Sequence, residues 1–152
     1  PLNFALSQGD NKMRATIFEK IVEKKGSVPT LIHPSANVSK YAQLGRGVVV
    51  HMNTVVHPDV TVGDNTVLSY NVSVTHSTHI GKNCYLAFGV MLGAYTIVED
   101  FVFIGIGAIV ISGKVDSIGT FASVGAGAVV TKSVASYECV AGNPAKFIKT
   151  LK

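Results

Sequence analysis

The stretch "VVVHMNTVVHPDVTVGDNTVLSY", residues 48–70, places an aliphatic side chain at every sixth position, at Val50, Val56, Val62 and Leu68. The same spacing runs without a miss from Ile32 to Val110, slips by two residues near "SGKVDS" and resumes at Ile118. Four residues after each of these positions comes a small or β-branched side chain in nearly every repeat. A period of six fits no α-helix, whose faces recur at 3.6 residues, but it does fit short strands joined by tight corners.

Three such strands and their corners make a triangular coil that repeats every 18 residues, stacked at about 4.8 Å on the next coil. The aliphatic and small residues point to the same side, because they lie two apart on a strand. Gly and Asn recur near the corners, where a positive φ costs them little. The sequence therefore predicts a parallel β-helix of about five and a half coils over residues 32–135, with Cys84 in its core.

The outward side chains form three columns, because residues 18 apart stack on one face. The columns are Val49, Val67, Tyr85 and Phe103; then Val55, Ser73, Met91 and Ile109; then Gln43, Thr61, His79 and Ile97. Two of the three faces are largely apolar, and a soluble monomer rarely exposes such patches. Since a three-sided rod can close cyclically on copies of itself, the pattern predicts a homotrimer.

Composition narrows the class of protein. No run approaches the roughly 18 uninterrupted apolar residues of a membrane helix, and residues 1–14 lack the features of a secretory signal. The two cysteines give neither a disulfide framework nor a zinc spacing, which favours a reducing cytoplasm. The net charge of +4 lies mainly in the two ends of the chain, and no basic stripe with interleaved aromatics indicates nucleic-acid binding.

Four segments carry a family resemblance: "LIHPSANVS", "FIGIGAIV", "SVGAGAVVTK" and "VAGNPAK". They resemble the bacterial sugar acetyltransferases of the hexapeptide class, most closely the sialic-acid O-acetyltransferase and UDP-4-amino-sugar N-acetyltransferase family. The resemblance implies a left-handed coil, acetyl-CoA as co-substrate and no metal. It also implies a nucleotide-linked sugar as acceptor, acetylated on an amine or a hydroxyl.

The leading segment, residues 1–31, resembles the last strand and helix of that family's nucleotide-sugar-binding domain. Its own pattern agrees: residues 2–6 suit a strand, Asp10 or Asn11 suits a helix cap, and Gly26 suits a helix stop. The predicted apolar stripe of the helix is Met13, Ile17, Ile21 and Val22. We expect the rest of that domain to lie upstream of Pro1. Gly9 matches a family glycine that lines the sugar-nucleotide pocket, and residues 136–152 are expected to form a capping tail.

The resemblance also assigns a catalytic histidine. It implies that His76, in "VTHST", is the general base, which must be neutral to take a proton from the attacking sugar group. The family's acid after the base is Ser77 here, and a hydroxyl stabilises imidazolium less than a carboxylate does. A weaker base is therefore expected. His79 has no family counterpart and is interpreted as a bystander.

Acetyl-CoA contacts are implied in the same way. A second family histidine that touches acetyl-CoA aligns with Tyr85, and two main-chain CoA contacts align with Ile106 and Ala126. Ala94, one coil beyond His76, offers an N–H as a candidate oxyanion donor. Ile106 and Ala126 stack on one corner and His76 lies on another, too far apart for one thioester. The base and the CoA track are therefore predicted to come from different subunits.

Two other readings stay open. Five histidines permit a zinc hydratase of the γ-carbonic anhydrase type, with its metal held between subunits. Ser77 and the missing upstream half also permit a catalytically inactive trimeric scaffold.

Overall fold

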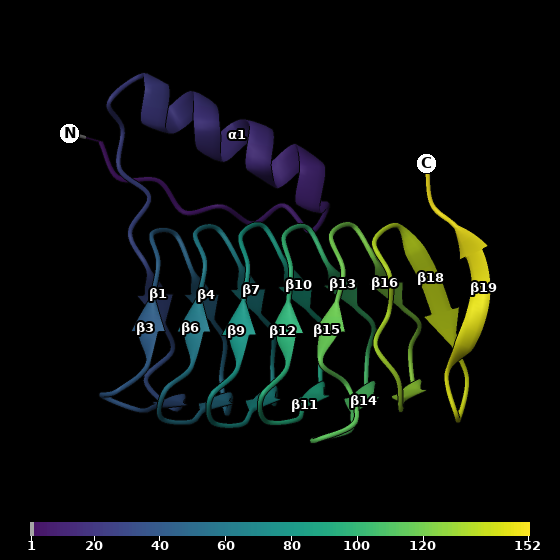
Figure 1. Cartoon of the computed structure of the whole chain (residues 1–152). Helices are drawn as coiled ribbons and strands as arrows, with labels where there is room; N and C mark the ends of the chain where they lie inside the picture. The colour runs from purple at the N-terminus through teal and green to yellow at the C-terminus, as the bar shows by residue number, and fades with distance from the viewer. Residues whose placement is uncertain (1) are drawn as a thin grey trace.

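The computed structural model describes residues 2–152, and its body is a solenoid with three flat faces (Figure 1). The first face is an eight-stranded sheet of β1 (Leu31–Ile32), β4 (Val49–Val50), β7 (Val67–Leu68), β10 (Tyr85–Leu86), β13 (Phe103–Ile104), β16 (Ser123–Val124), β18 (Glu138–Ala141) and β19 (Lys146–Thr150). The second face consists of β2 (Asn37–Val38), β5 (Val55–Val56), β8 (Ser73–Val74), β11 (Met91–Leu92), β14 (Ile109–Val110) and β17 (Val129–Val130). The third consists of β3 (Gln43–Leu44), β6 (Thr61–Val62), β9 (His79–Ile80), β12 (Ile97–Val98) and β15 (Ser117–Ile118).

Strands β1–β18 pair in parallel with the strand one coil away, so Val49 lies opposite Val67 and Thr61 opposite His79, whereas β18 and β19 pair antiparallel. After β14 the spacing lengthens, and Ile97 pairs with Ser117, which confirms the predicted two-residue slip. In Figure 1 the third face runs upward at the front, and the chain crosses the top, descends at the back and advances to the right. That path is a left-handed coil, as the family resemblance implied.

The core is the predicted column of aliphatic side chains. From Val50 to Val130 every sixth-position aliphatic residue, allowing for the slip, is at most 3% exposed. Cys84 is fully buried among them, as predicted, and burial raises the pKa of its thiol to about 12. The thiol therefore stays protonated and serves as a small apolar side chain.

Each corner turns on one residue in the left-handed region, with φ between 55° and 71°. Corner A joins the third face to the first and holds Gly47, Asn65, Asn83, Phe101, Phe121 and Tyr137 at this position. Corner B joins the first face to the second and holds Asn53, Asn71, Gly89, Gly107 and Gly127. Corner C joins the second face to the third and holds Asp59, Ser77, Tyr95 and Gly113. Gly and Asn adopt this conformation at low cost and hold nine of these fifteen positions, and the other six hold Asp, Ser, Phe or Tyr.

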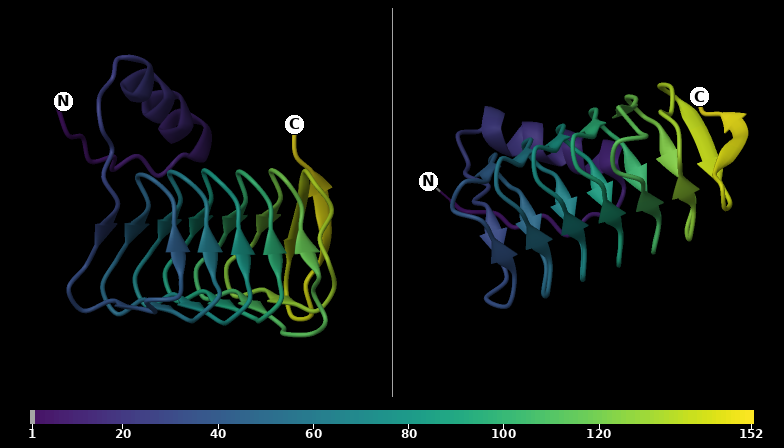
Figure 2. Two further views of the ribbon diagram at one scale, coloured as in Figure 1. Left: turned by 60° about the vertical axis from the view of Figure 1, so that its left-hand side comes forward. Right: turned by 60° about the horizontal axis from the view of Figure 1, so that its bottom comes forward.

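The helix α1 (Asn11–Glu23) lies outside the solenoid, with residues 2–10 extended beneath it along the coils (Figures 1 and 2). Asp10 is the N-cap, as predicted, and accepts a hydrogen bond from the Met13 N–H at 2.8 Å. The predicted strand over residues 2–6 is wrong, because that segment makes only one bridge, from Asn3 to Ser27. The helix ends before Gly26, whose N–H donates to the carbonyl of Ile21 at 2.9 Å.

The predicted apolar stripe of α1 is wrong at Met13, whereas Ile17, Ile21 and Val22 are half-buried. Met13 is 54% exposed, and the buried residues are Arg14, Ala15 and Phe18. The helix packs on a corner rich in backbone carbonyls, so its inward face needs a donor as well as apolar groups.

No helix among residues 2–152 is long and apolar enough to cross a membrane.

One predicted apolar face is covered by the chain itself. Residues 6–9 lie against the first face, where Val67 is only 6% exposed. On the second face Met91 remains 49% exposed. The N-terminal segment therefore covers the first face at Val67, whereas Phe103 on that face and Met91 on the second stay exposed.

Candidate active site

His76 lies at the tip of corner C with its ring exposed to solvent. The chain places it directly before Ser77, whose φ of 55° turns the corner. The Nδ1 atom of His76 is 3.4 Å from the Ser77 hydroxyl oxygen, and the Tyr95 ring packs edge-on at 5.3 Å between centroids. When Nδ1 carries the proton and donates it to Ser77, Nε2 has a free lone pair directed away from that contact. The geometry suits a general base.

No carboxylate of residues 2–152 bonds the His76 ring. The position that would supply one holds Ser77, at a long hydrogen-bond distance. A hydroxyl orients the ring but adds no negative charge beside an imidazolium. The His76 ring thus has a hydroxyl as its polar neighbour and no charged one.

The other histidines do not converge on His76. His79 projects from the third face and shares a hydrogen bond with the Thr61 hydroxyl, and His33 bonds Ser35 at 2.9 Å. Within the part of the chain that the structure describes, no three His, Cys, Asp or Glu side chains gather as one metal site. His79 stays a bystander in this geometry.

Corner B carries the predicted CoA track. The Gly127 N–H donates to the Ile106 carbonyl at 2.7 Å, so Ile106 and Ala126 stack in consecutive coils. Neither the Ile106 N–H nor the Ala126 N–H finds an acceptor in residues 2–152, and the Ile106 side chain is 58% exposed. A column of free amide donors on an exposed corner can bind the carbonyl groups of an extended ligand.

The Ala94 N–H is not free in this arrangement. It donates to the Ser112 hydroxyl oxygen at 3.0 Å, one coil further on. An oxyanion at the predicted Ala94 donor would have to displace that hydroxyl.

Tyr85 lies on the first face, stacked on Phe103 at 5.9 Å and 23°. Tyr85 and Gly9 both line a cavity of about 300 Å³. The structure thus brings together Tyr85, predicted to touch acetyl-CoA, and Gly9, predicted to line the sugar-nucleotide pocket. His76 belongs to a different corner of the same chain.

Arg14 is the residue that the sequence reading missed. Its guanidinium is buried and donates to the carbonyls of Gln8, Gly9, Asn65, Asn83 and Cys84 and to the Asn11 side chain, at 2.8–3.4 Å. Burial lowers its pKa from the ordinary value. One side chain therefore fixes the Gly9 segment, the start of α1 and corner A together. The only sequence signal was its place in "GDNKMR".

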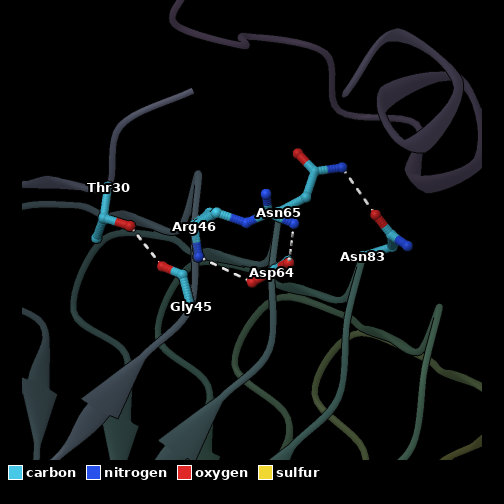
Figure 3. A network of polar contacts seen from close by, with 6 residues as sticks. All are labelled: Thr30, Gly45, Arg46, Asp64, Asn65 and Asn83. Carbon is cyan, nitrogen blue, oxygen red and sulfur yellow. Dashed lines mark hydrogen bonds and ion pairs between the residues drawn. The ribbon is translucent and has the colours of Figure 1, made fainter. Parts of the chain in front are cut away.

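Polar side chains also link successive coils along corner A (Figure 3). Asp64 accepts from the Arg46 N–H at 2.9 Å and pairs with its guanidinium at 3.1 Å. The Asn65 amide donates to the Asn83 side chain at 2.8 Å, and the Thr30 hydroxyl donates to the Gly45 carbonyl at 2.5 Å. Corner A is thus a structural seam that includes the ion pair of Arg46 with Asp64.

Comparisons with known proteins agree with this arrangement. Residues 41–76 match the family described as bacterial transferase hexapeptide (six repeats). No curated protein matches the chain. A solved structure of a histidine-to-alanine variant of GDP-perosamine N-acetyl transferase from Caulobacter crescentus, in complex with CoA and GDP-perosamine, is 31% identical. It has a TM-score of 0.93 over 97% of this chain and 70% of that chain.

Two further solved structures are similar over 96% of this chain and 70% of theirs. The acetyltransferase domain of PglB from Neisseria gonorrhoeae, in complex with acetyl coenzyme A, is 29% identical with a TM-score of 0.92. WeeI from Acinetobacter baumannii is 25% identical, also with a TM-score of 0.92.

Proposed function

The chain belongs to the family of hexapeptide-repeat acetyltransferases, and on that premise we propose that it moves an acetyl group from acetyl-CoA to an amine of a nucleotide-linked sugar. The observation that carries this proposal is the likeness, over 97% of the chain, to an enzyme structure that holds both CoA and GDP-perosamine. The exposed His76, with an unpaired ring nitrogen, supplies the base that such a transfer requires.

The reaction follows from the groups present. The sugar nitrogen attacks the thioester carbonyl carbon, and Nε2 of His76 accepts the proton that the nitrogen loses. The tetrahedral intermediate then expels the CoA sulfur, and the imidazolium returns its proton to the thiolate. Amide N–H groups of Ile106 and Ala126 hold the CoA arm by its carbonyl oxygens.

The two halves of this site come from different subunits. His76 lies on corner C and the free N–H groups lie on corner B, with the whole second face between them. A homotrimer that buries the second face, where Met91 is half-exposed, brings corner C of one subunit beside corner B of the next. Light scattering should then give a mass about three times the 16.0 kDa of one chain.

The test is release of the CoA thiol with a panel of nucleotide-linked amino sugars that includes GDP-perosamine. His76→Ala should lower kcat by a factor of about 10² to 10⁴, the usual contribution of a general base. His79→Ala is the matched control, because it removes a nearby exposed histidine, and its kcat should stay within about twofold of wild type. Equal rates for wild type and His76→Ala would show that His76 is not the base.

An inactive trimeric scaffold is the second candidate, and Ser77 beside His76 is the observation that favours it. The same assay decides between them. A scaffold gives no turnover with any panel member while retaining the trimeric mass.

A further inference from the structure

Tyr95 lies at corner C, one coil beyond Ser77, and its ring contacts the ring of His76. The two ring centroids are 5.3 Å apart and the ring planes meet at 87°, as in an edge-to-face aromatic pair. Tyr95 is 67% exposed, and among residues 2–152 its hydroxyl has no hydrogen-bond partner and its ring packs on no other aromatic ring. The contact with His76 is therefore what distinguishes this side chain from an ordinary exposed tyrosine.

The backbone at Tyr95 favours a different residue type. Its φ is 61°, in the left-handed region that Gly and Asn adopt at low cost and a bulky side chain adopts rarely. The same position of the neighbouring coils holds Ser77 and Gly113. An aromatic residue here costs conformational energy that Gly or Asn would avoid, so the turn itself gives no reason for a tyrosine.

At corner A the aromatic residues of the same position support one another. Phe101, Phe121 and Tyr137 have φ of 59° to 63°, and their rings stack from coil to coil with centroids 4.6 and 5.2 Å apart. Tyr95 has no such column, because the positions one coil before and one coil after it hold no ring. Stacking between coils thus explains the aromatic residues of corner A and does not explain Tyr95.

We infer that Tyr95 is a positioning residue for His76, an inference that rests on the proposed function. The His76 ring is exposed, and its hydrogen bond with Ser77 is long at 3.4 Å, so that bond holds the ring only weakly. Packing of the Tyr95 ring restricts His76 to the rotamer in which Nδ1 faces Ser77 and Nε2 is free to accept a proton. A base held in one rotamer meets the attacking group more often in the productive orientation, which raises kcat.

The kinetic test compares Tyr95→Asn with Tyr95→Phe. Tyr95→Asn removes the ring and suits a positive φ better than Tyr does, so the midpoint of urea unfolding should stay the same or rise. Its kcat should fall about three- to tenfold, the range that one edge-to-face pair supplies, while the KM values for acetyl-CoA and acceptor stay within about twofold of wild type. Tyr95→Phe keeps the ring without the hydroxyl and should restore kcat to within about twofold of wild type.

Tyr41→Asn is the matched control, because Tyr41 occupies the same corner two coils before Ser77 and is also exposed. Its kcat should stay within about twofold of wild type.

An NMR measurement on the same variants does not depend on turnover. With the histidine ring nitrogens isotope-labelled and the His76 signals assigned by their loss in His76→Ala, the nitrogen shifts of the neutral ring report which nitrogen carries the proton. The form with the proton on Nδ1 should predominate in wild type and in Tyr95→Phe. Its fraction should fall in Tyr95→Asn, because the ring then leaves the rotamer that faces Ser77.

Each result bears on one of the two proposals. A kcat of Tyr95→Asn equal to that of wild type would overturn the inference and leave the acetyltransferase intact. An equal loss of kcat in Tyr95→Phe would assign the effect to the hydroxyl, and a higher KM at constant kcat would make Tyr95 a substrate contact, and either result also overturns the inference. Absence of turnover by wild type with every panel member would overturn the proposed function, and the Nδ1-protonated fraction would then still decide whether Tyr95 orients His76.

Discussion

Corners A and B make the same backbone turn, but at corner A side chains of the next coil accept some of the backbone N–H groups that stay unpaired at corner B. At corner A the N–H of Arg46 is taken by Asp64 at 2.9 Å, and the N–H of Lys82 by Asp100 at 2.7 Å. At corner B the equivalent N–H groups of Ile106 and Ala126 have no acceptor in residues 2–152. The six-residue repeat produces the same turn at both corners. Side chains outside the core determine whether the N–H groups at a corner have acceptors.

The carbonyl groups differ in the same way. Helix α1 brings Arg14 and Asn11 onto corner A, where they donate to carbonyls of Asn65, Cys84 and Val102. No helix covers corners B and C, where Ile106 and His76 remain exposed. Backbone polar groups that leave water need a hydrogen-bond partner. Corner A has such partners within the chain, whereas the backbone groups of corners B and C remain available to ligands.

The largest effect on this contrast is expected from Arg14→Met. The substitution removes all six hydrogen bonds of a buried guanidinium and leaves several buried carbonyls unpaired. The free energy of unfolding should fall by about 3 kcal/mol, because orphaned buried acceptors carry their full desolvation cost. Urea unfolding at a fixed protein concentration measures it.

Arg46→Met is the matched control for Arg14→Met. Its side chain is 67% exposed and makes one ion pair, so its loss should cost at most about 1 kcal/mol. If both variants lower the free energy of unfolding equally, the buried hydrogen bonds of Arg14 stabilise the fold no more than the exposed ion pair of Arg46 does.

The solenoid could be predicted from the sequence because its physics is periodic. Each buried aliphatic position, such as Leu68 or Ile104, repeats the same inward geometry, and each corner repeats the same need for positive φ. The contacts of α1 do not repeat. Arg14 and Phe18 are buried by a corner whose carbonyls no local pattern reveals, so a periodicity argument selected Met13 instead.

The candidate site could be predicted only in part. Stacking by 18 residues, with the slip, placed Ile106 and Ala126 on one corner and His76 on another, and the structure has them there. The bond from Ala94 to Ser112 and the cavity beside His51 depend on side-chain directions and on where residues 6–9 lie. Neither follows from spacing along the chain.

A smaller effect is expected at corner C, where the His76 ring bonds a hydroxyl and no carboxylate of residues 2–152. Ser77→Asp places a carboxylate beside the His76 ring at a position with φ of 55°, which Asp tolerates better than most residues. The charge stabilises imidazolium, so kcat should rise about tenfold. Initial rates with saturating acetyl-CoA and acceptor measure it.

Ser77→Asn is the neutral counterpart of that variant. It has nearly the same shape and tolerance of positive φ but no charge, and its kcat should stay within about twofold of wild type. A gain in both variants would assign the effect to ring orientation, and a gain in neither would contradict the role of charge at corner C.

The smallest effect is expected from Asp64→Asn, which weakens the seam of corner A without touching the open corners. Burial of Asp64 raises its pKa, but hydrogen bonds from the Arg46 backbone and side chain outweigh this and hold the pKa below its ordinary value. A depressed carboxyl pKa stabilises the fold above the unfolded value of about 3.9, and the stabilisation is lost as pH falls through the folded pKa. The variant should therefore cost about 0.5–1 kcal/mol at neutral pH and almost nothing once the pH has fallen below the folded pKa, measured by urea unfolding. Asp116→Asn, whose side chain bonds nothing in residues 2–152, should cost little at either pH. If Asp64→Asn lowers the free energy of unfolding equally in acid, the charge of the Asp64 carboxylate does not stabilise corner A. The contrast with corner B would then rest on helix α1.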